Sequence, residues 1–155
     1  MTNMLSDQAR EFLREDHVAV VSTLNKDGSP HVTTIYYLLA DDGTFIMCTP
    51  GHSQKIKNLR RDPRIALCVG EGGRSVSLYG RVSICEDQAL VRLYLEQMVA
   101  RYVKEADRRS QVVTTRLQQA PVALHFLPEK VTEFFGGMRP PRQSELIPQP
   151  PTERE

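Results

Sequence analysis

Three short runs of β-branched and aromatic residues follow one another near the start of the chain, separated by two Gly-containing turns. The runs cover residues 18–24, 31–39 and 44–48, and the turns cover residues 25–30 and 40–43. Asp-Gly between apolar runs of this length is typical of antiparallel hairpins. The sequence therefore predicts three consecutive antiparallel strands.

The third run leads into a candidate anion site. The chain breaks at Pro50-Gly51 and is expected to resume as a helix over residues 53–60. Ser53 can cap this helix, and its exposed N–H groups and dipole favour a phosphate. Lys55 and Asn58 are expected to share one helix face, where they offer a cation and an amide. On these residues alone, an exposed basic surface helix is the alternative interpretation.

The strands and the helix together carry a family resemblance. Strand, turn, strand, turn, strand and then T-P-x-x-S-Q-K-x-x-N-L-x-x-D-P-R over residues 49–64 resembles the flavin/deazaflavin oxidoreductase superfamily. The resemblance covers about residues 5–139 and is most specific over residues 18–69. It implies a mainly β fold, the FMN-binding split β-barrel of pyridoxamine 5′-phosphate oxidase-like proteins, with antiparallel strands and α-helices.

Within that superfamily, the sequence is more similar to the branch that binds the deazaflavin coenzyme F420. In the flavin branch, an Arg commonly precedes the phosphate-binding Lys and a second basic residue lies early on the second strand. Here those positions are Gln54 and Thr33. In the F420 branch, a Lys followed three residues later by Asn is usual, and Lys55 with Asn58 fits this pattern. The segment Gly136-Gly137-Met138-Arg139 also resembles members of that branch.

The resemblance assigns eight cofactor-binding residues. Three of them would place their backbone beside the tricyclic ring: Thr33, Thr34 and Ile35. Five would hold the tail and its phosphate: Thr49, Ser53, Gln54, Lys55 and Asn58.

The resemblance implies an F420-dependent reductase that transfers a hydride to a small activated electrophile, such as a conjugated double bond or a quinone. One alternative is an FMN-binding oxidoreductase related to pyridoxamine phosphate oxidase, and another is a non-catalytic F420-binding carrier. No catalytic residue is assigned, because the cofactor carries the difficult chemical step. Tyr36 and Tyr37 are candidates for proton donation or ring packing, and at least one is expected in the core because neighbouring strand residues face opposite ways.

The remaining sequence predicts further strands and helices. Residues 5–15 are expected to form an amphipathic helix capped by Ser6, and residues 86–104 a helix across an open end of the barrel. Residues 106–119 are polar and ambiguous. Apolar periodicity predicts strands over residues 64–69, 75–85, 121–127 and 130–135. About six or seven strands and two or three helices suit a small barrel, with Gly80 at a bend.

Residues 1–139 are expected to form one domain, followed by a Pro-rich tail over residues 140–155. Half of the ten prolines lie in this tail, amid Gln, Ser and Glu, a composition typical of disorder or of an arm ordered by a partner. The family resemblance implies a homodimer with two equivalent sites at its interface. Ser75, Ser77 and residues 136–139 are candidates for completing the site of the facing subunit.

Charge and hydropathy exclude several other functions. The net charge of +1 and the absence of Trp argue against a nucleic-acid surface, which needs a concentrated basic face and often stacking aromatics. No apolar run approaches the roughly 20 residues that a membrane-spanning helix needs. The polar N-terminus carries no signal-peptide pattern, so the expected location is cytoplasmic and the expected partner a small-molecule substrate.

Neither the cysteines nor the histidines predict a metal site. Three cysteines lie in apolar surroundings without C-x-x-C spacing and are expected to be buried free thiols: Cys48, Cys68 and Cys85. Four histidines are scattered without metal-ligand spacing: His17, His31, His52 and His125.

Overall fold

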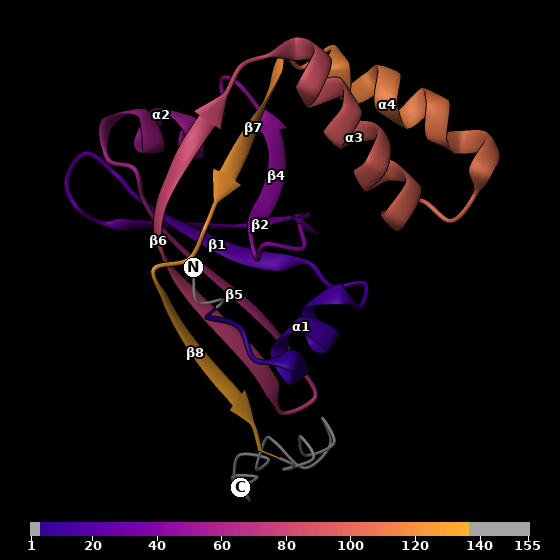
Figure 1. Cartoon of the computed structure of the whole chain (residues 1–155). Helices are drawn as coiled ribbons and strands as arrows, with labels where there is room; N and C mark the ends of the chain where they lie inside the picture. Colours follow the sequence, from indigo (N-terminus) through magenta and orange to yellow (C-terminus); the bar gives the residue numbers. More distant parts are fainter. Residues whose placement is uncertain (1–3, 137–155) are drawn as a thin grey trace, which may run out of the picture.

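The computed structural model describes residues 4–136, which form a curled antiparallel sheet with four α-helices (Figure 1). Part of the strand expected over residues 31–39 is separate, because the chain leaves the sheet at Tyr36 and Tyr37. The described residues form eight strands, where six or seven were expected. They also form four α-helices, where two or three were expected. The strands are β1 (Ala19–Leu24), β2 (Pro30–Ile35), β3 (Leu38–Leu39), β4 (Phe45–Pro50), β5 (Arg64–Glu71), β6 (Arg74–Cys85), β7 (Pro121–Phe126) and β8 (Lys130–Phe135).

One long strand, β6, belongs to both halves of the split barrel. The strand order is β2-β1-β5-β6-β7-β4-β3, and β8 also pairs with β6. The first part of β6 pairs with β5 and β8, and residues Val82 to Cys85 pair with β7. In Figure 1, β6 runs from the part of the molecule near β8 to the part near β7 and β4. The expected antiparallel split barrel is confirmed.

Gly80 lies where β6 changes partners. A Cβ atom at Gly80 would lie 3.0 Å from the Phe126 ring and 3.1 Å from the Glu129 backbone nitrogen. The Glu129 N–H in turn donates a hydrogen bond of 2.9 Å to the carbonyl of Tyr79. Glycine therefore allows the link between β7 and β8 to approach β6 closely.

Two positive backbone angles confirm the predicted hairpin turns. Gly28 has φ 85° and Gly43 has φ 91°, a region that glycine enters without a steric penalty. In each turn an aspartate side chain accepts a backbone hydrogen bond of 2.9 Å, Asp27 from Ser29 and Asp42 from Thr44. These local bonds set the connections between β1 and β2 and between β3 and β4.

The core fills the inside of the curled sheet. Helix α1 (Asp7–Arg14) buries Ala9, Phe12 and Leu13 there. The Ser6 side chain accepts a hydrogen bond from the Ala9 N–H at 3.0 Å, so the predicted cap is confirmed. Side chains of four strands are also completely buried: Phe45, Met47, Val69, Leu78 and Phe126.

A helical layer covers part of the outer face of the sheet. Helix α3 (Gln88–Tyr102) and helix α4 (Arg109–Leu117), joined through a 3-10 turn (Ala106–Arg108), form a pair beside β4 and β7 (Figure 1). Helix α3 packs Val91 and Leu95 against Ala123 of β7. The polar stretch over residues 106–119, which its sequence left ambiguous, is thus largely helical. Helix α4 buries one side chain, Val113, and exposes most of the others.

The three cysteines differ in their exposure. Cys48 and Cys85 are half-buried, but Cys68 is exposed, because it lies on the outward face of β5. The expectation that all three are buried was wrong.

Residues 137–155, which include most of the segment 136–139 and the Pro-rich tail, lie outside the described residues. Within residues 4–136, no helix is long and apolar enough to cross a membrane.

Substitution of Gly80 by Ala is expected to lower the free energy of unfolding by about 1–3 kcal/mol, because the new methyl group would press on Phe126 and Glu129. Gly70→Ala is the matched control, since its Cβ would meet neighbours at an ordinary 3.6 Å. Urea unfolding followed by far-UV circular dichroism measures both variants. Equal stability of the two would contradict a required close approach at Gly80.

Candidate cofactor-binding site

The turn that leads into the candidate site is held tightly in place. Gly51 donates its N–H to the Ala120 carbonyl at 3.0 Å, and a Cβ on Gly51 would lie 2.7 Å from that oxygen. Glycine is therefore required sterically, and the contact ties the end of β4 to the start of β7. Helix α2 (Gln54–Arg61) follows with Ser53 at its N-cap position.

The N-terminus of α2 keeps several donors available. Ser53 occupies the predicted N-cap position but makes no side-chain capping hydrogen bond; its Oγ lies 3.4 Å from Thr49 Oγ1 instead. The N–H groups of Gln54 and Lys55 make no hydrogen bond with any residue in the described part of the chain. Free N–H groups and the positive end of the helix dipole together favour an anion at this point.

Lys55 adds a positive charge without a matching negative one. Its Nζ donates to Thr49 Oγ1 at 3.2 Å, and burial lowers the pKa of the Lys55 ammonium below its usual value. Among residues 4–136, no carboxylate forms an ion pair with it. A half-buried cation that lacks an acidic partner is stabilised by a bound anion.

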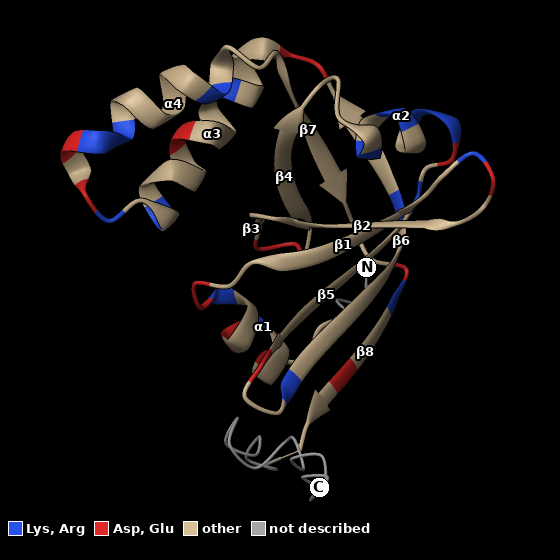
Figure 2. Ribbon diagram, turned by 180° about the vertical axis from the view of Figure 1, so that it is seen from behind, with Lys and Arg blue, Asp and Glu red and all other residues tan. Residues whose placement is uncertain are grey.

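The wider basic cluster is mostly paired within the protein. Figure 2 shows Lys and Arg concentrated along α2, yet Lys57 is the exposed cation of this helix for which the described residues supply no partner. The predicted helix end at Asp62-Pro63 is confirmed. The arginines are bound internally: Arg60 to Glu86, Arg61 to the Leu24 carbonyl and Arg64 to Asp62.

Asn58 is completely buried and faces the protein. Its amide nitrogen donates to Thr23 Oγ1 at 3.1 Å and to Asn25 Oδ1 at 3.0 Å. Its amide oxygen accepts from Gln54 Nε2 at 2.9 Å and from Arg61 at 3.3 Å. These bonds use the hydrogen-bonding capacity of the amide. Asn58 therefore anchors α2 to the end of β1, and the side chain of Gln54 is occupied by the same bond.

The three predicted ring-contacting residues lie on β2, an edge strand of the sheet. The side chain of Ile35 belongs to the core, and that of Thr34 is exposed. The contact of the β2 backbone with the cofactor ring stays a proposal. Thr33 Oγ1 is buried and has no hydrogen-bond partner among the described residues. A buried hydroxyl without a partner costs free energy, which a ligand atom would recover.

The neighbouring tyrosines have different roles. Tyr37 is completely buried and donates its hydroxyl to the Leu13 carbonyl at 2.7 Å, and burial raises the pKa of its phenol. Tyr36 is 45% exposed and packs against Tyr102 in a tilted contact, with ring centroids 4.7 Å apart. The expectation of at least one core tyrosine is confirmed by Tyr37, and Tyr36 is the exposed member of the pair.

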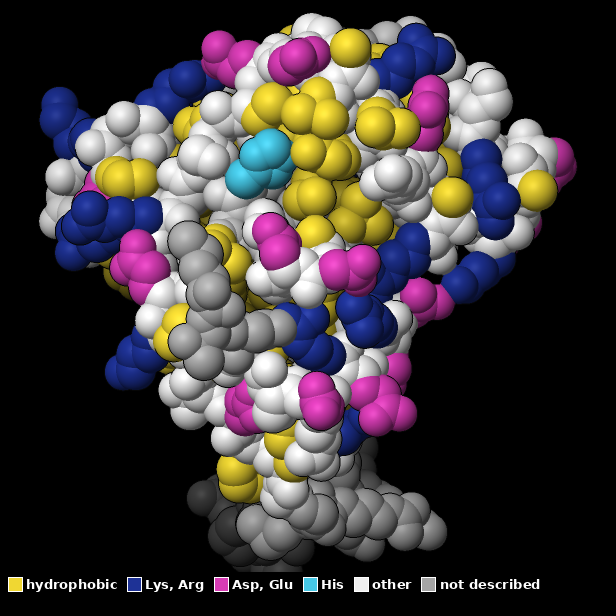
Figure 3. All heavy atoms as spheres, in the orientation of Figure 1, with side chains coloured by type: hydrophobic (Ala, Val, Ile, Leu, Met, Phe, Trp, Pro, Cys, Tyr) yellow, Lys and Arg dark blue, Asp and Glu magenta, His cyan; other side chains and the backbone are white. Residues whose placement is uncertain are grey.

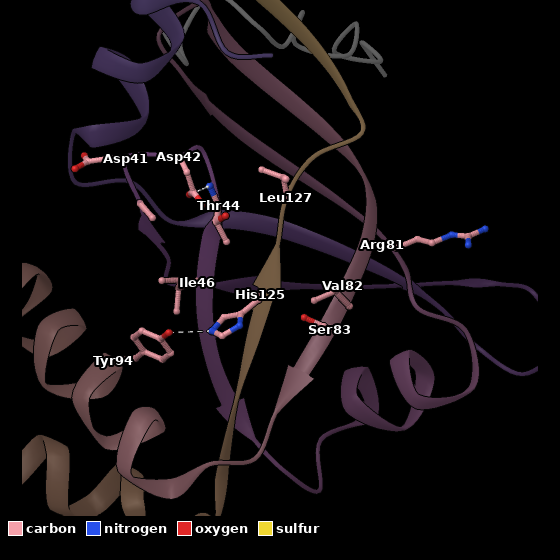
Figure 4. Close-up of a pocket in the computed structure, with 11 residues that line it drawn as sticks. Asp41, Asp42, Thr44, Ile46, Arg81, Val82, Ser83, Tyr94, His125 and Leu127 are labelled. Atoms are coloured by element: carbon pink, nitrogen blue, oxygen red, sulfur yellow. Dashed lines mark hydrogen bonds between the residues drawn. The ribbon is translucent and has the colours of Figure 1, made fainter. Parts of the chain in front are cut away.

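A separate hollow lies away from these residues. It measures about 700 Å³ and is bordered by the β3–β4 turn, β6, β7 and Tyr94 of α3. Figure 4 shows the side chains of Tyr94 and His125, both in the lining, pointing toward each other. The Tyr94 hydroxyl lies 3.1 Å from His125 Nε2. Figure 3 shows hydrophobic side chains over this part of the surface. None of the eight predicted residues lines this hollow. Sequence reasoning missed the Tyr94–His125 pair because its members lie 31 positions apart.

One group of side chains has metal-ligand types. Glu15, His17 and Glu71 bring their ligand atoms within 4.8 Å of one another. The guanidinium of Arg74, however, already donates to both carboxylate oxygens of Glu15, at 2.9 and 3.1 Å, and lies over the Phe12 ring. The positive charge of Arg74 would repel a metal ion bound to Glu15, so the cluster is interpreted as a structural ion-pair network.

Comparisons with known proteins agree with this architecture. A family model described as pyridoxamine 5′-phosphate oxidase matches residues 5–134. An F420H(2)-dependent biliverdin reductase of Mycobacterium tuberculosis (strain CDC 1551 / Oshkosh) is 40% identical over 93 residues, which are 59% of this chain and 67% of that protein.

Two solved structures share the fold at low sequence identity. A conserved hypothetical protein of Mycobacterium tuberculosis superposes with a TM-score of 0.71 at 23% identity, covering 86% of this chain and 88% of the other. An F420 reductase superposes with a TM-score of 0.67 at 17% identity, covering 83% and 98% of the two chains.

Replacing Asn58 by Ala is expected to lower the free energy of unfolding by about 2 kcal/mol or more, because the buried Thr23 of β1 and the adjoining Asn25 lose their hydrogen bonds. Gln54→Ala is the control and is expected to cost less than about 1 kcal/mol, since Gln54 is exposed. Urea unfolding measures both. A stable Asn58→Ala variant with reduced ligand affinity would instead favour direct ligand contact by Asn58.

Proposed function

The chain belongs to the pyridoxamine 5′-phosphate oxidase family, and from this premise we propose that it is an F420-dependent reductase. The substrate class proposed is a small activated electrophile, such as a conjugated double bond or a quinone. The similar F420H(2)-dependent biliverdin reductase supports the coenzyme assignment. The observation that carries the proposal is the half-buried Lys55 ammonium at the N-terminus of α2, which has no acidic partner within residues 4–136.

In the proposed site, the phosphate of the coenzyme lies against the start of α2. Lys55 supplies the charge, while the hydroxyls of Thr49 and Ser53 and the N–H groups of Gln54 and Lys55 supply hydrogen-bond donors. Asn58 acts indirectly, by fixing the helix that presents these groups. The unpartnered Thr33 hydroxyl on β2 offers a further donor for a polar ring atom.

The charge of the site favours F420 over FMN. The two positions where the flavin branch carries cations hold the neutral Gln54 and Thr33. Gln54 also commits its side chain to Asn58. A single cation, Lys55, then faces the phosphate, which suits a singly charged phosphodiester better than the dianionic phosphate monoester of FMN.

Reduced F420, when bound, supplies the hydride. The chain itself orients the coenzyme and the substrate, and it excludes water where Ile35 and Thr49 are buried. Tyr36 is the proposed proton donor because the residue is exposed and its hydroxyl makes no hydrogen bond within residues 4–136, whereas the Tyr37 hydroxyl is bound to the Leu13 carbonyl.

A homodimer is proposed from the outward face of the sheet formed by β2, β1, β5, β6 and β8. Strand register places Thr34, Val20, Cys68, Ser77 and Thr132 in one row across this face. Large apolar side chains near this row are exposed: Val32 at 58%, Phe134 at 55%, Tyr79 at 44% and Val20 at 43%. An exposed apolar patch of this kind marks an interaction surface, and twofold symmetry is the usual arrangement.

Steady-state turnover tests whether the protein is a reductase or a carrier. Purified protein is mixed with reduced F420, and coenzyme oxidation is followed by absorbance with and without an acceptor. Menadione, cyclohexenone and biliverdin cover quinone, enone and tetrapyrrole acceptors. A reductase oxidises the coenzyme faster with at least one acceptor, whereas tight binding of the coenzyme without acceptor-dependent oxidation would support the carrier.

Lys55→Ala is expected to weaken F420 binding by about 1–3 kcal/mol, roughly 5- to 150-fold, because one charge-assisted contact is lost. Lys57→Ala removes the same charge from an exposed position of α2 and is expected to change the affinity by about twofold at most. Fluorescence titration of the coenzyme measures both variants. Equal effects of the two substitutions would contradict a specific role for Lys55.

A pH series provides a further control for Lys55. Anion binding favours protonated Lys55, so the affinity of the natural protein is expected to fall as the pH rises through the lowered pKa of this group, below about 10.5. Lys55→Arg keeps its charge in this range and is expected to show a flatter profile.

The homodimer is expected to protect Cys68, which is exposed in the single chain and lies within the proposed interface. Iodoacetamide labelling followed by mass spectrometry is expected to be slow at high protein concentration and faster on dilution. Cys48 stays slow throughout, because burial raises the pKa of its thiol to about 12. Rapid Cys68 labelling at every concentration, together with a monomeric mass, would contradict the proposed interface.

A further inference from the structure

A small apolar cavity lies between the helical layer and the sheet, on the side of β4 opposite the cofactor-binding hydroxyls. Its volume is about 150 Å³. Cys48 of β4 lines it, whereas Thr49, the next residue, is a member of the proposed cofactor site; neighbouring strand residues point to opposite faces. Tyr36, which directly follows the predicted ring-contacting strand, forms another wall.

The larger share of the cavity lining is nonpolar. Helix α3 contributes Leu95, Met98 and Val99, each less than 10% exposed. A cavity of about 150 Å³ has room for a group the size of one benzene ring. The aromatic rings of Tyr36 and Tyr102 form a wall against which a flat ring can pack.

The wall formed by Tyr102 is rigid. Its hydroxyl donates to the His17 carbonyl at 2.7 Å, and the Arg101 guanidinium lies over its ring at 5.0 Å from the centroid. Tyr102 therefore holds its position without a ligand, so little ordering cost is added when one binds. Tyr36, by contrast, lies partly exposed where the cavity meets solvent.

One cation lines the same cavity. Arg116 of α4 is exposed, and within residues 4–136 its guanidinium makes no hydrogen bond or ion pair. The helix dipole favours a cation in the last turn of α4. The dipole alone does not explain why Arg116 also lines the cavity. Cys48 adds no negative charge opposite it, because burial keeps its thiol protonated by raising its pKa to about 12.

We propose that this cavity is a binding site for a small molecule with one aromatic or similarly sized ring and an anionic group, the ring lying between α3 and the tyrosines and the anion facing Arg116. The proposal of a binding site depends only on the cavity, its lining and Arg116. Its use as the substrate pocket of the reductase rests on the proposed function. In that use it would select ring-bearing carboxylates among the activated electrophiles.

Benzoate is the probe for this site, and benzyl alcohol is the matched ligand with the same ring and no charge. Protein carrying ¹³C-methyl methionine is titrated with each in the absence of coenzyme and observed by NMR. Met98 lines the cavity and Met47 lies in the barrel core, outside the cavity lining. A saturable shift of the Met98 signal is expected with little change at Met47, with benzoate binding more tightly than benzyl alcohol.

The cation is tested by Arg116→Gln, which is expected to weaken benzoate binding about fivefold and to change benzyl alcohol binding by about twofold at most. Arg108→Gln, an exposed arginine of the same helical layer outside the cavity lining, is expected to leave both affinities unchanged. No saturable shift at Met98, or equal affinity for the two probes in the natural protein, would overturn the proposal. If benzoate binds as expected but F420 does not bind, the cavity assignment stands and the proposed function fails.

Discussion

The passage of strand β6 through Gly80 is the constraint on which the rest of the structure depends. At this residue β6 exchanges β8 for β7 as a partner, and a Cβ atom here would lie only 3.0 Å from the Phe126 ring and 3.1 Å from the Glu129 backbone nitrogen. Strand β7 then positions β4 by pairing along its whole length. The turn after β4 is held against the residue before β7 by the Gly51–Ala120 bond. The location of helix α2, and with it the candidate cofactor site, follows from this chain of contacts.

Helix α2 separates structural groups from groups available to a ligand. Asn58 points inward and satisfies its amide within the protein, so it determines where the helix lies. Lys55, one turn earlier, has no acidic partner in the described residues, and the first N–H groups of the helix are also available. Proteins seldom leave a half-buried cation unpaired without a function for it. The contrast between Asn58 and Lys55 therefore supports an anion-binding role for this helix end.

Sequence patterns predicted the elements that local interactions determine. The turns at Gly28 and Gly43, the cap at Ser6 and the end of α2 at Asp62 depend on nearby residues and were confirmed. The inward role of Asn58 depends on Thr23 and Asn25, more than 30 positions away, and had no local signal. The cavity that joins Tyr36, Cys48, Met98 and Arg116 likewise exists only through tertiary packing. The ambiguous segment 106–119 became helical because α3 offers it a surface, which composition alone does not reveal.

A side-by-side equilibrium titration of the purified protein with F420 and with FMN tests the central claim most directly. The chain has no Trp, so quenching of each coenzyme's own fluorescence gives the signal. The proposed site predicts micromolar or tighter binding of F420 and much weaker binding of FMN. Equal or tighter binding of FMN would contradict the assignment and place the protein with the flavin-dependent members of its family.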